Sequence, residues 1–235
     1  MTGVRTERRT ALLADLRTIG VPWLTARALL VTAYVTAYAI ADRVVPGNRP
    51  TALGEGLVAW DGTWYRDIAS HGYGPLPREG LRFFPLFPLL GRALGTVFLG
   101  NTGPALVLIA NLCSIALLVV LLRLLRRERI DAATSQRVVW YTVLFPGAFV
   151  LAWAYAEALW ILAAVLVFLA IRNRQWALAI LAGFVAGLSR PLGVLLAVPV
   201  AVELARCWRT ADPPERARGL IAVLSPILGT GAYLV

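Results

Sequence analysis

The sequence of 235 residues contains no lysine, only one histidine and only two cysteines. The cysteines, Cys113 and Cys207, lie far apart without a partner spacing, so we expect neither a disulfide framework nor a zinc site. The aspartates are not spaced like the ligands of a divalent cation, and the sequence has no glycine-rich phosphate loop. We therefore expect no metal and no cofactor, and the missing loop argues against nucleotide binding.

Apolar residues dominate the rest of the chain. They make up 59% of it, and the mean hydropathy of +0.71 lies well above that of an ordinary soluble domain. Stretches close to 20 residues with few charges recur, which is the length that a helix needs to cross a hydrocarbon core of ~30 Å. The sequence therefore predicts an all-α integral membrane protein.

The net charge of +10 comes entirely from arginine. Such a charge can indicate binding to nucleic acid, but these arginines cluster between the apolar runs rather than along one face. The positive-inside pattern of membrane proteins explains this distribution better, because short cytoplasmic loops carry an excess of basic residues. We therefore expect membrane lipids as partners, and no nucleic acid.

The chain divides into a basic cytoplasmic tail over residues 1–20 and a single transmembrane domain over residues 21–235. The first apolar run is too long for the core of a signal peptide and indicates a retained first span. The chain stops inside an apolar run, so we expect a fragment of a longer protein. The predicted spans cover about 21–45, 104–122, 138–152, 158–171, 176–188, 192–203 and 219–235.

The charges of the loops predict the topology. A cytoplasmic N-terminus places three arginine-rich loops in the cytoplasm, at residues 123–137, 172–174 and 206–218. The opposite side of the plasma membrane then receives the outer loop 46–103, the turn at residues 155–157 and Arg190. Residues 83–100 are also apolar, and a span there would invert every later segment. Nearby prolines and arginines favour a helix at the interface instead.

The densest group of polar and aromatic side chains lies in residues 60–73, and the predicted topology brings it to the same face as Glu157 and Arg190. Glu157 can mark the water boundary of its helix or face a cavity, since a carboxylate within a membrane bundle is costly. Arg190 can anchor a lipid headgroup or bind a phosphate. The convergence of these residues predicts a polar site at the outer face.

The acidic residues of this group have structural interpretations too. Asp61 can cap a helix over residues 62–70 that ends at Gly72. Asp67 lies six residues later and projects about 120° away on a helix, so we expect it to pair with a surface arginine rather than with Asp61. The only histidine, His71, is expected to be a capping or solvated residue.

Three motifs follow one another in a characteristic order. The first comprises Trp60-Asp61, Ile68-Ala69, Gly72-Tyr73 and the run Phe83-Phe84-Pro85-Leu86-Phe87-Pro88-Leu89. The others are Phe145-Pro146-Gly147-Ala148-Phe149 with Tyr155-Ala156-Glu157, and Ser189-Arg190-Pro191-Leu192-Gly193. Over residues 55–203 they resemble the PIG-V-type mannosyltransferases, GT-C glycosyltransferases with bacterial relatives. Ala156 departs from that family, in which serine is frequent at this position.

The resemblance implies a GT-C-like multi-span helical bundle whose first outer loop carries interfacial helices. It also implies the transfer of mannose, with inversion, from a polyprenyl-phosphate-mannose donor to a glycolipid or glycan acceptor at the non-cytoplasmic face. Asp61 would then be the general base, because members of the family use a carboxylate in the first outer loop.

The resemblance and the chemistry of arginine also indicate substrate-binding residues. Arg190 is the first candidate for the donor phosphate, followed by Arg66 and Arg82, because a guanidinium stays charged and donates two parallel hydrogen bonds. Glu157 can bind sugar hydroxyls or orient an arginine. Three aromatic residues can stack on a sugar or anchor the loop in the interface: Trp60, Trp64 and Tyr65.

Two other functions stay open. A transporter or flippase for a lipid-linked or anionic substrate would explain the helix breaks at Pro146 and Pro191. Transporters tend to keep ionisable residues near the membrane midplane, however, and the runs 104–122 and 158–171 carry no charge. A structural subunit or an inactive relative would retain the motifs for packing alone.

Overall fold

The computed structural model describes residues 2–44, 47 and 50–234; within these ranges the protein is 84% helical and contains no strand, which confirms the all-α prediction. The end of the first predicted span at residue 45, residues 46, 48 and 49 of the outer loop, and residue 235 lie outside the described ranges. The α-helices are α1 Thr2–Val44, α2 Thr51–Glu55, α3 Asp61–His71, α4 Leu86–Gly95, α5 Thr102–Arg127, α6 Ala132–Leu144, α7 Glu157–Arg172, α8 Trp176–Ser189, α9 Ala197–Cys207 and α10 Pro213–Leu234. The 3₁₀ helices are η1 Gly56–Val58, η2 Arg78–Arg82, η3 Thr96–Phe98, η4 Pro146–Leu151 and η5 Pro191–Leu196.

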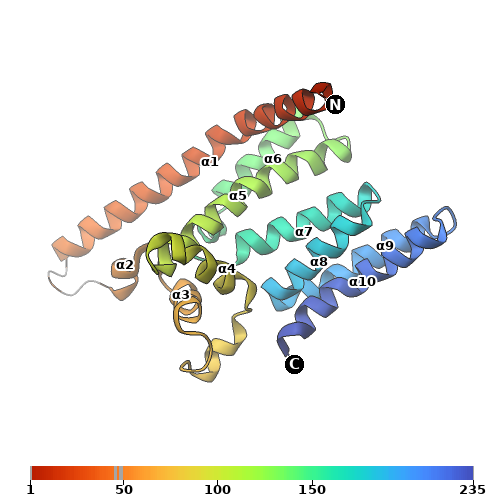
Figure 1. The fold of residues 1–235 in the computed structure, drawn as a ribbon. Helices are drawn as coiled ribbons and strands as arrows, with labels where there is room; N and C mark the ends of the chain where they lie inside the picture. Colours follow the sequence, from red (N-terminus) through yellow and green to blue (C-terminus); the bar gives the residue numbers. More distant parts are fainter. Residues whose placement is uncertain (1, 45–46, 48–49, 235) are drawn as a thin grey trace.

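The long helices lie side by side, so the bundle has two ends (Figure 1). One end, which we call the arginine-rich end, contains the start of α1 and the connections at residues 128–131, 173–175 and 208–212. The other, which we call the loop end, contains α2, α3, α4 and the end of α10. The three arginine-rich loops therefore gather at one end of the molecule, away from residues 50–101.

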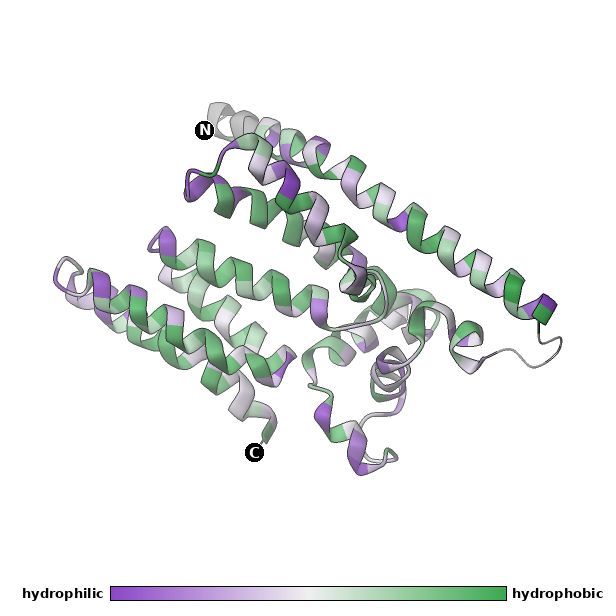
Figure 2. Cartoon of the chain, turned by 180° about the vertical axis from the view of Figure 1, so that it is seen from behind, coloured by the Kyte–Doolittle hydropathy of each residue, from purple (hydrophilic) through white to green (hydrophobic). Residues whose placement is uncertain are grey.

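Apolar residues line the middles of the helices, and polar residues concentrate at the two ends of the bundle (Figure 2). Three helices in the described part of the chain are long and apolar enough to cross a membrane: Arg9–Val44 within α1, Thr102–Arg127 and Pro213–Leu234. The apolar helix α8 is shorter, with 14 residues, and α7 has 16 residues. Length and composition together thus suggest a membrane protein.

The segment that includes α4 does not cross the bundle. Residues Leu86–Phe98 form α4 and η3, which lie at the loop end between α3 and the start of α5. The chain leaves α1 and enters α5 at the same end of the bundle (Figure 1). The prediction that the apolar run 83–100 is not a span agrees with this path.

Residues 9–20, which belong to the predicted tail, continue the first span as the same helix. Asp15 is only 1% exposed and lies between two arginines of α5, with its carboxylate oxygens 3.3 Å from Arg123 Nε and 2.5 Å from Arg126 Nη2. Ile19 is buried against α5 and α6. This part of the basic tail is therefore packed against the bundle, because its one acidic residue pairs with the basic end of α5.

Proline ends one predicted span early and changes the start of another. The residue before a proline is driven out of the helical region, and both Phe145 and Arg190 adopt extended backbone angles before Pro146 and Pro191. As a result, α6 ends at Leu144 rather than at residue 152, and the predicted span 192–203 is divided between η5 and α9. After the first break the chain leads through η4 to α7, and after the second it leads through η5 to α9.

Glycines allow α8 and α10 to approach closely. A Cβ atom on Gly187 would lie 2.1 Å from the carbonyl oxygen of Pro226, and one on Gly229 would lie 2.3 Å from that of Phe184. Small residues at such positions let membrane helices pack backbone against backbone. This contact holds the end of α8, where Arg190 follows, next to the C-terminal part of α10.

Candidate functional site

A cavity of about 310 Å³ opens at the loop end of the bundle. Its walls come from α3, from η2 and the segment after it, and from the junction of α8 and η5. The lining residues are Asp61, Tyr65, Arg82, Phe83, Phe84, Ser189, Arg190 and Pro191. Four predicted site residues, which are Asp61, Tyr65, Arg82 and Arg190, therefore share one cavity.

The start of α3 presents a carboxylate to this cavity. Trp60 has a φ of +57°, which is rare for a residue other than glycine and is typical of strain at functional sites. The helix begins at Asp61 rather than at residue 62, and its N-cap position is Trp60, which makes no side-chain capping hydrogen bond. Tyr65 lies one turn further on the same face. Gly72, with a φ of +79°, follows the last residue of the helix as predicted.

The Asp61 carboxylate has no cation bound to it. It lies within electrostatic range of Arg190, but within the described ranges it forms no ion pair and no hydrogen bond. Its backbone N–H donates to the hydroxyl of Tyr155 at 3.3 Å. The residue is half-buried. The cavity thus contains a carboxylate that is free to accept a proton from a ligand.

The turn at residues 152–156 locks the start of α3 in place. The N–H of Ala154 donates to the carbonyl of Leu57 at 2.9 Å. A Cβ atom on Gly62 would lie 3.4 Å from the Cβ atom of Ala154, so the two backbones are in close contact. Ala154 and Ala156 are completely buried. The turn that precedes Glu157 therefore packs directly against the residue that follows Asp61.

Glu157 and Arg190 form an ion pair at the edge of the cavity. The extended conformation of Arg190 ends α8, and its guanidinium contacts the first residue of α7. The second carboxylate oxygen of Glu157 is buried without a hydrogen-bond partner among the described residues. Of the two roles predicted for Glu157, the structure favours the orientation of an arginine, and the unpartnered oxygen leaves room for a contact to a ligand.

Arg82 adds a second positive charge to the cavity. Its guanidinium lies over the ring of Phe83, 5.4 Å from the ring centroid, and the side chain is exposed. Two arginines from distant parts of the chain therefore line the cavity that holds Asp61. A pair of guanidinium groups in a partly enclosed space is suited to a phosphate.

The predicted aromatic residues have different environments. Trp60 is 57% exposed and stacks on Trp153 at 4.8 Å between ring centroids, so one face of its ring stays accessible. Trp64 stacks on Phe83 at 5.6 Å. Tyr65 is only 3% exposed, and its ring is packed edge-on against neighbouring phenylalanines. Trp60 is therefore the most accessible of the three for stacking on a ligand, whereas Tyr65 offers the cavity only its hydroxyl edge.

Arg66 does not line the cavity. Its guanidinium donates to Glu55 at 2.7 Å and to Asp67 at 3.1 Å, on another face of α3. Two acidic partners already occupy this arginine, so the structure gives no support to its predicted role in phosphate binding. The expectation that Asp67 pairs with an arginine is confirmed. His71 is exposed at the end of α3, outside the cavity lining.

The tyrosines of the site are poor proton acceptors. Burial raises the pKa of the Tyr65 hydroxyl, and the nearby Arg190 opposes this rise only in part. Burial also raises the pKa of Tyr155 to about 12. Both hydroxyls are thus protonated at neutral pH, so they can donate or accept a hydrogen bond but do not act as bases. Because Arg190 holds Glu157, Asp61 is the lining residue best suited to act as a base.

One arginine that supports the site was not among the predicted residues. Arg27 lies within α1 and donates to Asn111 at 2.9 Å, to Ser114 at 2.7 Å and to the carbonyl of Leu151 at 2.9 Å. Asn111 in turn donates to the carbonyl of Ala152 at 2.8 Å. The two side chains satisfy carbonyls that the break after α6 leaves without helical partners. A charged residue inside an apolar run was the signal in the sequence.

Comparison with protein families, curated proteins and solved structures finds no match. In the described part of the chain, no three histidine, cysteine, aspartate or glutamate side chains gather closely enough to hold a metal ion. The chemistry of the site therefore has to be argued from the cavity itself, which is lined by the unpaired carboxylate of Asp61 and by two arginines.

Proposed function

We propose that the protein is a membrane glycosyltransferase that moves mannose from a polyprenyl-phosphate-mannose donor to a glycolipid or glycan acceptor. The observation that carries the proposal is the cavity in which the unpaired carboxylate of Asp61 lies with Arg82 and Arg190. A base for a hydroxyl group and cations for a departing phosphate are the two requirements of this reaction. The identity of the sugar rests on the resemblance of the motifs to the PIG-V-type family.

The reaction assigns each group a role. Asp61 accepts the proton of the acceptor hydroxyl. At the same time the oxygen of that hydroxyl forms a bond to the anomeric carbon. The bond between that carbon and the phosphate oxygen breaks, and the polyprenyl phosphate leaves with the electron pair and one additional negative charge. Attack from the face opposite to the phosphate inverts the anomeric centre. General-base assistance of this kind contributes on the order of 10²- to 10⁴-fold in rate.

The two arginines would receive the departing phosphate. Arg190 is oriented by Glu157, and Arg82 is exposed at the wall of the cavity. Guanidinium groups that are already in position stabilise the charge that develops on the leaving oxygen without further rearrangement. Trp60, with one accessible ring face, is then the best placed of the predicted aromatic residues to contact a sugar.

The proposal includes a topology. It places the arginine-rich end in the cytoplasm and the cavity at the non-cytoplasmic face, in a GT-C-like bundle in which shorter helices such as α7 and α8 also cross the plasma membrane. The gathering of the arginine-rich loops at one end of the bundle supports this arrangement, because the positive-inside rule favours such loops in the cytoplasm. Accessibility labelling tests the topology, with single cysteines introduced at residues 61 and 174 after replacement of Cys113 and Cys207. The proposed topology requires these two cysteines to be labelled from opposite sides of the membrane.

The decisive experiment measures mannosyl transfer in three membrane preparations at matched expression. One contains the parent protein, one the Asp61→Asn variant and one the Asp67→Asn variant. We expect Asp61→Asn to lose at least about 10²-fold in rate, because the amide keeps the size but cannot accept the proton. Asp67→Asn is the matched control on the same helix, since its carboxylate binds Arg66 outside the cavity. Full transfer by Asp61→Asn would exclude Asp61 as the base and direct attention to Glu157.

A second candidate function is transport of a lipid-linked or anionic substrate. Arg27 within the first long helix and the helix breaks at Pro146 and Pro191 favour it, since transporters combine intramembrane charges with interrupted helices. Uptake of polyprenyl-phosphate-mannose into sealed vesicles, without transfer of the sugar, would support transport over glycosyl transfer.

A further inference from the structure

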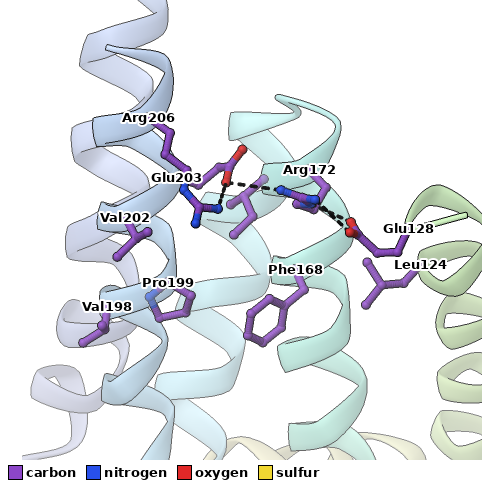
Figure 3. Close-up of a pocket in the computed structure, with 10 residues that line it drawn as sticks. Leu124, Glu128, Phe168, Arg172, Val198, Pro199, Val202, Glu203 and Arg206 are labelled. Carbon is purple, nitrogen blue, oxygen red and sulfur yellow. Dashed lines mark hydrogen bonds and ion pairs between the residues drawn. The ribbon is translucent and has the colours of Figure 1, made fainter. Parts of the chain in front are cut away.

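A second cavity lies at the arginine-rich end of the bundle, opposite the proposed site. It has a volume of about 530 Å³ and opens between α5, α7 and α9 (Figure 3). Its floor is apolar and is formed by Leu124, Phe168, Ile171, Val198, Pro199 and Val202. Its charged residues are Glu128, Arg172, Glu203 and Arg206. The cavity is therefore a groove with an apolar floor and a charged rim.

The charges of the rim are not equivalent. Arg172 lies between two carboxylates: it binds Glu128 with N–O distances of 2.5 and 2.7 Å, and Glu203 at 3.6 Å (Figure 3). Among the described residues Arg206 has one ion-pair partner, Glu203 at 3.4 Å, and its side chain is 67% exposed. Most of the hydrogen-bond donors of the Arg206 guanidinium are thus available to a ligand at the mouth of the groove.

The floor of the groove needs an apolar occupant. Val198 is 63% exposed, and Val202 and Phe168 are also exposed in part. Exposure of such apolar surface to water costs about 25 cal/mol of free energy per Å². Within a membrane, acyl chains are the apolar molecules present at highest concentration, and they reach such a groove from the side.

The combination of the apolar floor with a guanidinium that has a single acidic neighbour, Glu203, favours one kind of occupant. A helix of another protein would cover the floor but would need an acidic side chain of its own to pair with Arg206. A phospholipid provides an acyl chain for the floor and a phosphate that accepts two hydrogen bonds from the guanidinium. We propose that the groove between α5, α7 and α9 binds one phospholipid, with its phosphate on Arg206 and an acyl chain along Phe168.

This lipid site is separate from glycosyl transfer and depends only on the protein being in a membrane. The groove lies near the ion pairs that join α5 to α7 and α7 to α9, which are Arg172 with Glu128 and Arg172 with Glu203. A bound chain would fill the space between the helices that these pairs connect. The proposed role of the lipid is thus to stabilise the arrangement of α5, α7 and α9.

Native mass spectrometry of the purified, delipidated protein with added phosphatidylglycerol tests the proposal. We expect one lipid to bind to the parent protein, and about tenfold weaker binding to Arg206→Ala, because charge-assisted hydrogen bonds are lost. Arg137→Ala removes an exposed arginine of α6 outside the groove and is expected to bind as the parent does. Thermal unfolding of each variant checks that it is folded.

Val198→Trp is the second variant, because the larger side chain fills the groove from an exposed position and leaves the buried core unchanged. We expect it to abolish the single bound lipid. Equal lipid binding by the parent, Arg206→Ala and Val198→Trp would overturn the proposal, as would a protein dimer in place of the lipid complex. Loss of binding in Val198→Trp alone would overturn the assignment of the phosphate to Arg206.

Discussion

The two ends of the bundle use arginine in opposite ways. At the arginine-rich end, the arginines that contact α1, α5 and α7 have partners within the protein: Arg123 and Arg126 hold the buried Asp15, and Arg172 holds Glu128. Pairing of this kind satisfies the charges and ties the helices together. The paired charges that we have described at this end therefore serve the structure.

The loop end leaves its charges incompletely paired. The Asp61 carboxylate has no partner in the described ranges, one oxygen of Glu157 is buried without a hydrogen bond, and Arg82 contacts only an aromatic ring. Unpaired polar groups in a partly buried cavity raise the free energy of the empty protein. Such groups are found where a ligand supplies the missing partners. This difference between the ends supports our proposal that the chemistry takes place at the loop end.

The largest expected effect comes from Arg190, which lines the same cavity as Asp61. Replacement of Arg190 with Gln should lower the rate of mannosyl transfer by about 10²- to 10³-fold, because a donor for the developing charge is lost. Arg190→Lys keeps the charge but loses the planar fork and should fall between the parent and Arg190→Gln. Steady-state kinetics of all three proteins in membranes provide the measurement.

The matched control for this prediction is the same change at the other end, Arg172→Gln. The substitution removes the ion pair with Glu128. Because Arg172 is the last residue of α7 and lies at the arginine-rich end, far from the cavity, the transfer rate per folded molecule should stay the same. An equal loss of transfer in both variants would mean that the arginines of the two ends do not differ in role.

The second prediction concerns the buried ion pair of the arginine-rich end. Asp15→Asn removes the carboxylate that accepts from Arg123 and Arg126, and should destabilise the protein by about 2 kcal/mol. Thermal unfolding in detergent measures this change, while transfer by the remaining folded protein should be unaffected. A defect in transfer without loss of stability would contradict a structural role for this pair.

The third prediction concerns Arg27 of α1, which donates a hydrogen bond to the carbonyl of Leu151 beside the turn at residues 152–156. Without its guanidinium, the carbonyl of Leu151 loses a donor and the turn at residues 152–156 becomes less well held. Cysteines at Gly62 and Ala154, whose Cβ atoms would lie 3.4 Å apart, should form a disulfide readily in a variant without Cys113 and Cys207. Adding Arg27→Leu should slow this oxidation by about tenfold.

Arg27→Lys serves as the conservative control for the crosslinking experiment, because an ammonium can restore one of the three hydrogen bonds. We expect it to recover part of the lost rate. Unchanged crosslinking in Arg27→Leu would show that the turn is held by its contacts with α3 alone. The readout does not involve catalysis, so it stays informative whether or not the protein transfers mannose.

The sequence was sufficient to predict that the site residues lie at the same end of the bundle, but not which of them contact one another. The X-Pro pairs at Pro146 and Pro191 and the glycines of the motifs predict turns at one end, and the arginine-rich loops indicate the other. The contact between Glu157 and Arg190, however, depends on how α7 and α8 pack, which local patterns do not specify. The same is true of Arg66, whose partner Glu55 lies in a helix that the sequence analysis did not predict.

Arg27 illustrates a second reason why sequence patterns miss part of a site. Its role depends on carbonyls that are free only because α6 ends at Leu144, and the predicted span to residue 152 concealed this break. Once a span is assumed to be continuous, a polar residue opposite the break has no visible partner. An arginine in a span and a proline in a neighbouring span are therefore more informative when they are considered together.

The smallest expected effect is at the exposed pair of Arg172 and Glu128. The hydrogen bond from Arg172 holds the pKa of Glu128 below its ordinary value. A lowered pKa in the folded state stabilises the protein above the pKa of the unfolded glutamate, about 4.3, and this contribution is lost as the pH falls through the folded value. Glu128→Gln should thus lower the melting temperature by less than about 2 °C at pH 7, because exposed pairs contribute little.

The pH dependence of this small difference is the sharper test. The melting temperatures of the parent and Glu128→Gln should converge between about pH 5 and pH 3, since protonation of Glu128 removes the charge that the substitution removes. A difference that persists at pH 3 would assign the effect to packing at the groove rather than to the ion pair. Arg172 is expected to contribute little to stability or transfer, because its partners lie within the protein and its pair is exposed. Replacement of Arg190 is expected to lower the transfer rate about a hundredfold, because in our proposal Arg190 also binds the phosphate of the substrate.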